Sequence, residues 1–95
     1  MPDTTNDIQE SRQKIDEIDS AIVKLLNERA EYANKIGQLK KLLSLAVHQP
    51  EREEIVLEHV RSANDGPLSD NSIARIFIRI IEESRRLEKE TSTDK

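Results

Sequence analysis

The stretch IQESRQKIDEIDSAIVKLLNERAEYANKIGQLKKLL, residues 8–43, decides the fold of this chain. Its apolar residues recur at alternating steps of three and four, which is the period of an α-helix and not that of a strand. Heptad position a holds Ile8, Ile15, Ile22, Ile36 and Leu43, and position d holds Ile18, Leu25, Tyr32 and Leu39. No proline interrupts the pattern before Pro50, and Asn6 with Gln9 resembles a capping box. We therefore predict one long helix over roughly residues 6–43.

Two shorter helices are predicted after it. Pro50 suits the first position of a second helix, and the run Asn64–Pro67 supplies its stop. Ser69 is a good N-cap for a third helix, which we expect to continue to about Lys89. The apolar stripe of this third helix consists of Ile73, Ile76, Phe77, Ile80, Ile81 and Leu87. The sequence thus predicts an all-α fold with one long, one short and one medium helix.

The composition supports a helical chain with a thin core. Charged residues make 36% of the 95, against about 25% in an average globular protein, and there are only two glycines and three prolines. A sandwich, a barrel or a nucleotide-binding α/β fold needs more turn residues than this. We expect a single domain over residues 1–95, with flexible ends at residues 1–6 and about 90–95.

Several classes of protein are excluded by what the sequence lacks. Without cysteine there is no disulfide, thiolate nucleophile or thiolate metal ligand, and His48 and His59 form no ligand cluster, so we predict no metal site. The net charge of −4 argues against a nucleic-acid partner. The polar start and the absence of a long apolar run predict a soluble, cytoplasmic protein without a membrane partner.

The length of the first helix predicts a homodimer. A helix of about 38 residues spans about 57 Å, whereas a compact monomer of this size has a radius of gyration of only about 12 Å. The apolar seam of such a helix would protrude into water. A second copy that covers the seam is the simplest solution.

Three cationic residues interrupt or flank this seam. Arg29 occupies an a position, and Arg12 and Lys40 occupy e positions on the same stripe. Each, taken alone, is also explained as a snorkelling or rim charge. Arg29 and Lys40, however, are about 16 Å apart on one helix face, so their side chains can converge on one small ligand. Arg12 lies about 25 Å further back and can join them only from a partner chain.

The shorter helices place further polar groups beside apolar stripes. Arg52 and Glu53 open the second helix, and Ser84 and Glu88 continue the stripe of the third at i+4 steps. Singly, Glu53 is also explained by the helix dipole and Glu88 by a solvated helix end. Together with the cations they describe a small polar pocket inside a bundle, suited to a compact dianion. The pairs Lys40-Lys41 and Arg85-Arg86 are interpreted as mixed-charge helix faces.

These residues resemble those of the all-helical (AroQ-type) chorismate mutases, over nearly the whole chain. The segments that carry the resemblance are RQKIDEIDSAIVKLLNERAEYANKIGQLK, PEREE, GPLSD and IARIFIRIIEESRRLE, in this order. The resemblance implies a single chorismate mutase domain in an intertwined homodimeric bundle, with chorismate as substrate and no metal or cofactor. It also implies conversion of chorismate to prephenate, a Claisen rearrangement of the shikimate pathway, in the biosynthesis of Phe and Tyr.

The resemblance also implies roles for residues of the long helix. Arg12 would be donated across the dimer to the partner's site, and Arg29 would bind a substrate carboxylate within its own chain. Lys40 would contact a carboxylate and the ether oxygen, and Ser84 of the third helix would lie near a carboxylate. Arg29, Lys40 and Glu88 are the implied catalytic residues.

The remaining implied roles include two departures from the family pattern. Arg52 and Glu53 match the Arg-Glu pair that opens the second helix, with Glu53 binding the ring hydroxyl. Gln49 stands where the family commonly has Asp. Glu88 stands at the second ether-oxygen donor, where many bacterial members have Gln, and only its protonated form can donate a hydrogen bond.

Two other functions stay open from the sequence. An isochorismate pyruvate lyase uses the same type of pocket. A non-catalytic helical dimer that acts as a regulatory module has the same helical pattern but no need for a substrate. Docking on another shikimate-pathway enzyme is also left open.

Overall fold

In a computed structural model, the chain forms three helices, and the structure describes residues 4–45 and 50–93. These are α1 (Thr4–Leu42), α2 (Pro50–Ala63) and α3 (Asp70–Thr93). No strand occurs in the described ranges, and the all-α prediction is confirmed. α3 continues beyond Lys89 because the residues that follow include neither Gly nor Pro to stop it. Of the ends expected to be flexible, residues 1–3 and 94–95 lie outside the described residues.

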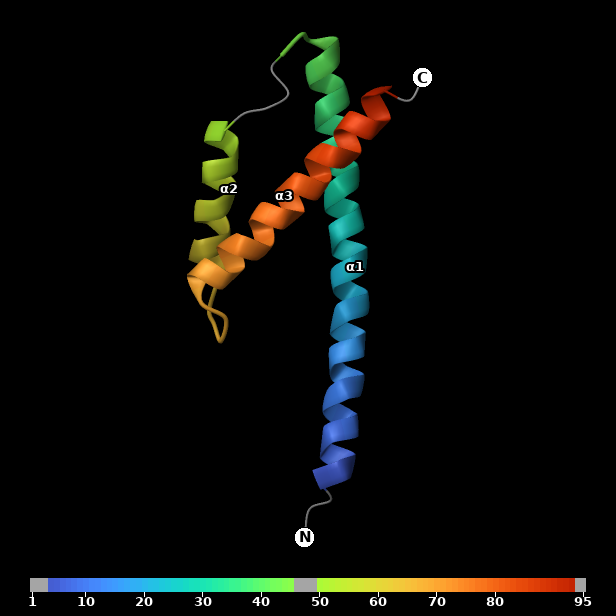
Figure 1. Cartoon of the computed structure of the whole chain (residues 1–95), viewed down its shortest axis with the longest axis vertical. Helices are drawn as coiled ribbons and strands as arrows, with labels where there is room; N and C mark the ends of the chain where they lie inside the picture. The colour runs from blue at the N-terminus through green and yellow to red at the C-terminus, as the bar shows by residue number, and fades with distance from the viewer. Residues whose placement is uncertain (1–3, 46–49, 94–95) are drawn as a thin grey trace.

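The chain is elongated rather than compact. It measures 66 Å along its longest axis, against 30 and 14 Å along the others. Its radius of gyration is 17.8 Å, where a compact chain of this length would have about 12 Å. Figure 1 shows the reason, since the N-terminal half of α1 projects well beyond the other two helices. The protrusion predicted from the length of the first helix is therefore present.

The helix α3 holds the chain together. It crosses α1 and also packs against α2, whereas no Cα of α1 lies within 8 Å of a Cα of α2 in the described residues (Figure 1). Leu57 of α2 and Ala74 of α3 are the buried residues of the described chain, and no residue of α1 over Thr4–Leu42 is buried. A small residue such as Ala74 allows two helix backbones to approach closely. The core of one chain is thus limited to the α2–α3 contact.

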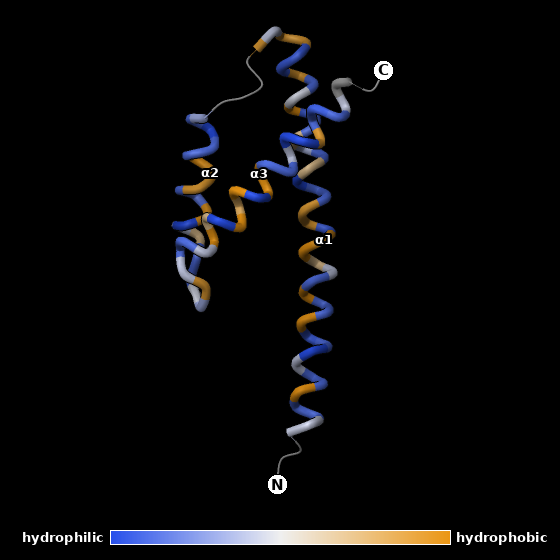
Figure 2. Tube along the Cα trace, in the orientation of Figure 1, coloured by the Kyte–Doolittle hydropathy of each residue, from blue (hydrophilic) through white to orange (hydrophobic). Residues whose placement is uncertain are grey.

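Apolar bands recur along one side of α1 in Figure 2, as the heptad pattern predicts. These side chains are exposed in the single chain. They include Ile8, Ile15, Ile18, Ile22, Leu25, Leu26, Tyr32, Ile36, Leu39 and Leu43. The seam is therefore formed as predicted, and its side chains remain between 39% and 69% exposed in the single chain.

The turn between α2 and α3 is closed by side-chain hydrogen bonds. Ser69 Oγ accepts a hydrogen bond from the backbone N–H of Ser72 at 3.0 Å, which confirms the predicted N-cap. Asn64 donates through Nδ2 to the carbonyl of Leu68 and to Asp70 Oδ1, each at 2.8 Å. These bonds fix the direction in which α3 leaves α2.

A Schellman motif ends α1. Leu45 N donates to the carbonyl of Lys40 at 2.8 Å, and Ser44 N donates to the carbonyl of Lys41 at 3.2 Å. Ser44 has a φ of 57°, which is a left-handed conformation. The residue at this position of a Schellman motif is usually Gly. The Cβ of Ser44 makes this conformation unfavourable by about 1 kcal/mol.

Ser44→Gly is expected to raise the free energy of unfolding by about 0.5–1 kcal/mol, because Gly adopts a positive φ without strain. Urea unfolding at one fixed protein concentration measures the change. Ser20→Gly, on the exposed face of α1, is the control and is expected to lower stability by about 0.5 kcal/mol. Equal destabilisation by both substitutions would contradict a strained Ser44.

Candidate active site

The arginine in the apolar seam of α1 is hydrogen-bonded to α3. Arg29 donates through Nη1 to Ser84 Oγ at 3.3 Å, and both residues are half-buried. A guanidinium has five N–H donors in a planar fork. The bond to one hydroxyl uses only one of them, so the group has further donors to offer an anion.

A second contact between α1 and α3 lies about two turns further along α1. A Cβ built on Gly37 would lie 3.3 Å from both Cδ and Oε2 of Glu88, so this carboxyl group rests against the backbone of Gly37. The lack of a side chain at Gly37 is what allows α3 to approach α1 this closely. Glu88 is half-buried, although its place near the end of α3 also allowed a solvated side chain.

Burial is the main influence on the pKa of the Glu88 carboxyl group. It raises the pKa of this group above its ordinary value, because a charged carboxylate is less well solvated there. The positive charges of Lys40 and Arg85 act in the opposite direction and lower this pKa. A carboxyl group with a raised pKa keeps its proton to higher pH, and a protonated carboxyl can donate a hydrogen bond.

α2 reaches the same part of α3 through an ion pair. The Glu53 carboxylate, in the first turn of α2, is paired with the guanidinium of Arg85. Glu53 is half-buried, so it faces the other helices as the sequence predicts. The pair joins two residues that are 32 positions apart in the chain.

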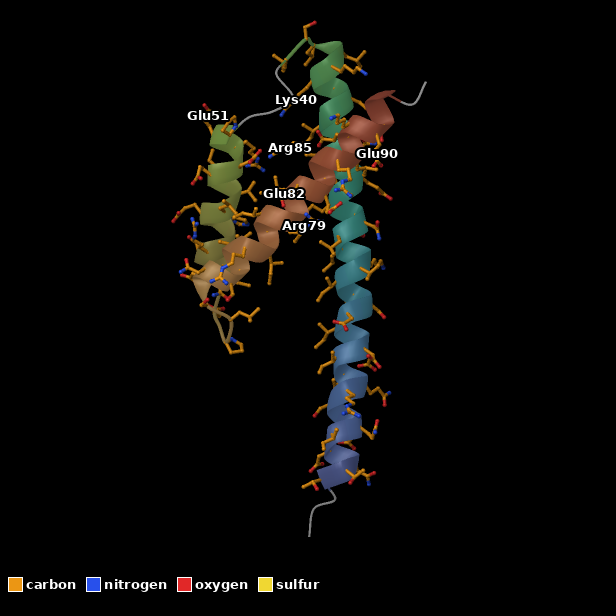
Figure 3. All side chains as sticks on the ribbon, viewed as in Figure 1. Lys40, Glu51, Arg79, Glu82, Arg85 and Glu90 are labelled. Carbon is orange, nitrogen blue, oxygen red and sulfur yellow. The ribbon has the colours of Figure 1, made fainter. Side chains whose placement is uncertain are left out.

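Six polar residues from three helices therefore gather around the segment Ser84–Glu88 of α3. They are Arg29 and Lys40 of α1, Glu53 of α2, and Ser84, Arg85 and Glu88 of α3. Figure 3 shows Lys40 and Arg85 on the side of the α1–α3 crossing that faces α2. Cationic and acidic groups alternate in this cluster, which suits a small ligand with both carboxylate and hydroxyl groups.

The other predicted site residues lie apart from this cluster. Arg12 is exposed on the projecting half of α1, about 25 Å along the helix from Arg29. Arg52 is exposed in the first turn of α2, next to Glu53. Gln49 and His48 lie outside the described residues. His59 is exposed on α2.

The interpretation of Arg85 and Arg86 as one mixed-charge face is wrong for Arg85. Arg86 does pair along its own helix, with Glu83 at 3.8 Å. Arg85 instead reaches across to Glu53 of α2. The sequence contained a signal for this, because Arg85 follows the half-buried Ile81 by four residues and so continues the apolar stripe.

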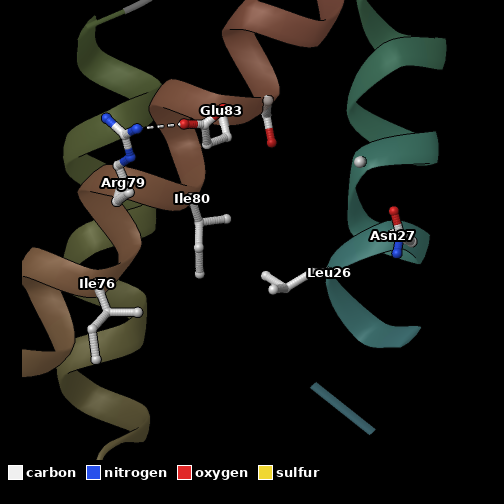
Figure 4. A pocket seen from close by; sticks show the side chains of 8 residues that line it. Leu26, Asn27, Ile76, Arg79, Ile80 and Glu83 are labelled. Carbon is white, nitrogen blue, oxygen red and sulfur yellow. Dashed lines mark ion pairs between the residues drawn. The ribbon is translucent and has the colours of Figure 1, made fainter. Parts of the chain in front are cut away.

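An apolar groove of about 480 Å³ lies between α1 and α3, with Ser84 on its lining. Figure 4 shows Leu26 of α1 directed toward Ile80 of α3, with the Arg79–Glu83 ion pair at the edge. The lining residues are Leu26, Asn27, Ala30, Ile76, Arg79, Ile80, Glu83 and Ser84. The groove thus joins the exposed seam of α1 to the residue that binds Arg29.

The described residues contain no cluster of three or more His, Asp or Glu side chains arranged to hold a metal ion. Nor is any helix within residues 4–45 and 50–93 both long and apolar enough to cross a bilayer.

Comparison with known proteins assigns the family. Residues 11–89 match the family described as chorismate mutase type II. The chain belongs to this chorismate mutase family. The match includes every residue that the sequence predicts for the site, from Arg12 to Glu88.

Relatives within the chorismate mutase family are of two lengths. A bifunctional chorismate mutase/prephenate dehydratase of Neisseria gonorrhoeae is 46% identical over 78 residues, which are 82% of this chain and 21% of the relative. A corresponding bifunctional protein of Aquifex aeolicus is 37% identical over 87% of this chain and 24% of its own length. The chain thus spans about a fifth to a quarter of these bifunctional relatives. A chorismate mutase of Methanocaldococcus jannaschii is 33% identical, over 87% of this chain and 85% of the relative.

A solved chorismate mutase has the same fold. The structure of form II of the enzyme from Thermus thermophilus matches with a TM-score of 0.84 and 35% sequence identity. The match covers 86% of this chain and 93% of that chain. The arrangement of three helices in this chain is therefore the fold of a chorismate mutase.

Proposed function

We propose that this chain converts chorismate to prephenate, at a site built around Arg29, Lys40 and Glu88. One observation carries the proposal: a half-buried carboxyl with a raised pKa lies beside Lys40, at the same helix crossing where Arg29 bonds Ser84. Its place in a chain of the chorismate mutase family gives these groups a substrate that fits them.

The reaction explains why these residue types suffice. Chorismate rearranges within one molecule, and the ether C–O bond breaks before the new C–C bond is complete, so no nucleophile is needed. The enzyme has to hold the enolpyruvyl arm over the ring, which is a matter of positioning. It also has to stabilise negative charge on the ether oxygen, which preorganised hydrogen-bond donors and cations do well.

Each carboxylate of the substrate has a cationic partner in the proposal. Arg29 binds one carboxylate in its own chain, with Ser84 beside it, since a guanidinium fork matches the two oxygens of a carboxylate. Lys40 contributes a compact charge that reaches a carboxylate and the ether oxygen. The closeness of Lys40 to Glu88 supports this, because both have to approach the same oxygen.

The acidic residues have two different tasks. Glu88, protonated, donates a hydrogen bond to the ether oxygen, and its burial against Gly37 supports that role. Glu53, with Arg52 beside it, binds the ring hydroxyl from the first turn of α2. For Gln49, which precedes α2, we propose a contact to the same hydroxyl.

We further propose that the active form is a homodimer. Ile15, Ile18, Ile22 and Leu25 on the projecting part of α1 are between 46% and 62% exposed. Covering side chains that are about half exposed contributes about 1 kcal/mol each. The seam and the groove beside it fit the α1 of a second copy, which brings the partner's Arg12 within reach of the site. The single domain is proposed to extend over residues 1–95, in a soluble, cytoplasmic protein.

The proposal is tested by following chorismate loss through its ultraviolet absorbance. Wild type is expected to consume chorismate, and Arg29→Ala to lose about 10²–10³-fold in kcat/KM, the effect of removing one preorganised charged donor. Lys24→Ala, on the exposed side of α1, is the matched control and keeps full activity. A wild type that leaves chorismate untouched but releases pyruvate from isochorismate would instead identify a lyase.

Activity is expected to fall as pH rises through the raised pKa of Glu88, because only the protonated carboxyl donates to the ether oxygen. Glu88→Gln carries a permanent N–H donor and is expected to flatten this alkaline fall. The test is to measure kcat/KM as a function of pH for wild type and Glu88→Gln, from acid to mildly alkaline pH. Identical profiles in the two proteins would remove Glu88 from the mechanism.

Mixing two inactive variants tests whether Arg12 acts across the dimer. A heterodimer of Arg12→Ala with Arg29→Ala has one site with both arginines and one with neither. Unfolding and refolding an equal mixture is therefore expected to restore about a quarter of wild-type activity, since about half of the dimers are mixed. No recovery, with heterodimers demonstrated by mass spectrometry, would show that both arginines act within one chain.

A further inference from the structure

Arg85 lies between the two acidic residues of the proposed site. Its guanidinium is paired with Glu53 of α2, and its charge acts on Glu88 three positions further along its own helix. It follows Ser84 directly, so it belongs to the segment around which the cluster gathers. None of the proposed substrate contacts uses Arg85.

The arrangement of the helices gives the Glu53 pair a particular importance. α2 packs on α3 and not on α1 in the described residues. The backbone of α2 is therefore positioned relative to that of α1 through α3. Arg85 is the residue of α3 that bonds Glu53, near the point where α3 also meets α1 through Ser84 and Glu88.

A carboxylate on the first turn of a short helix has several rotamers open to it. A guanidinium fork restricts that freedom more than a single-point charge does. The Arg85 side chain is 43% exposed, against 65% for its helical neighbour Arg86, which is paired with Glu83 instead. The Arg85–Glu53 pair therefore restricts the orientation of the carboxylate that α2 contributes to the site.

We propose that Arg85 is a positioning residue, which holds the Glu53 carboxylate in the orientation that receives the ring hydroxyl of the substrate. The inference rests on the proposed mutase function and deepens it. Arg85 does not touch the substrate in this proposal. It acts through Glu53, and its loss weakens substrate binding more than turnover.

A double-mutant cycle tests whether Arg85 acts through Glu53. Arg85→Ala is expected to raise KM for chorismate by about three- to tenfold with little change in kcat, the effect of one weakened hydrogen bond. In a Glu53→Ala background the same substitution is expected to change kcat/KM by no more than about twofold, because the group it positions is absent. Independent, multiplying effects of the two substitutions would overturn the proposal.

Arg86→Ala is the matched control, since it removes the same charge from the next position of α3. It is expected to leave KM unchanged. Arg85→Lys restores the charge but not the fork, so it is expected to recover only part of the lost affinity. Full recovery with Lys, or an equal loss with Arg86→Ala, would show a general effect of charge and not a positioning contact.

A pH profile separates this role from a purely structural one. The groups that act on Glu88 are Lys40 of α1 and Arg85 of α3, with uncharged Gly37 of α1 against the carboxyl and Glu53 of α2 bound to Arg85. Removing Arg85 removes a charge that lowers the pKa of Glu88, so the alkaline fall of activity is expected at higher pH in Arg85→Ala. Arg85→Lys is expected to keep the wild-type profile. An unmoved profile in Arg85→Ala would contradict the placement of Arg85 in the site.

Failure of this inference and failure of the proposed function give different results. If wild type does not consume chorismate, the proposed function is wrong, and the inference falls with it. If wild type and Arg86→Ala are active and Arg85→Ala has wild-type KM, only the inference is wrong. Helical content by circular dichroism, equal in all variants, shows that the comparison concerns folded protein.

Discussion

Most of the apolar seam of α1 is exposed in the described chain, and the rest of the architecture depends on this constraint. No residue of this helix is buried, and the buried residues of the described chain lie at the contact between α2 and α3. A core of that size supplies little of the apolar burial that a stable domain needs. The isoleucines of α1 lie on an exposed surface, and the groove beside Ser84 lies next to it.

Close helix packing and the polar residues of the proposed site occur together where α3 crosses α1. Gly37 lets the carboxyl group of Glu88 rest on the helix backbone, and Arg29 is bonded to Ser84 about two turns away. Half-buried charges are unfavourable without partners, and here each cation lies near a hydroxyl or carboxyl group from another helix. In the proposed function, a dianionic substrate completes the charge balance of this site. The family to which the chain belongs acts on a molecule of this kind, which gives the unusual seam arginine a physical reason.

Much of this could be predicted from the sequence because helical periodicity is a local property. Local sequence signals predict the three helices and the cap at Ser69. Spacing along single helices also predicts the inward faces of Arg29, Ser84 and Glu88. The pairing of Arg85 with Glu53 could not be predicted in the same way, since it depends on the angle between α2 and α3. Helix spacing also leaves the partner of Arg12 undefined, because that residue is far from the cluster in its own chain. The family resemblance supplied roles for these residues that spacing alone does not contain.

The projecting half of α1 has a consequence for how such a protein is controlled. In the proposed homodimer, a catalytic centre that receives Arg12 from the partner subunit exists only while the two subunits remain associated. Dilution of such a dimer would remove activity as well as quaternary structure, and a molecule that strengthens the association would also raise activity. The rate per chain of the proposed reaction would then depend on the concentration of the chain in the cell.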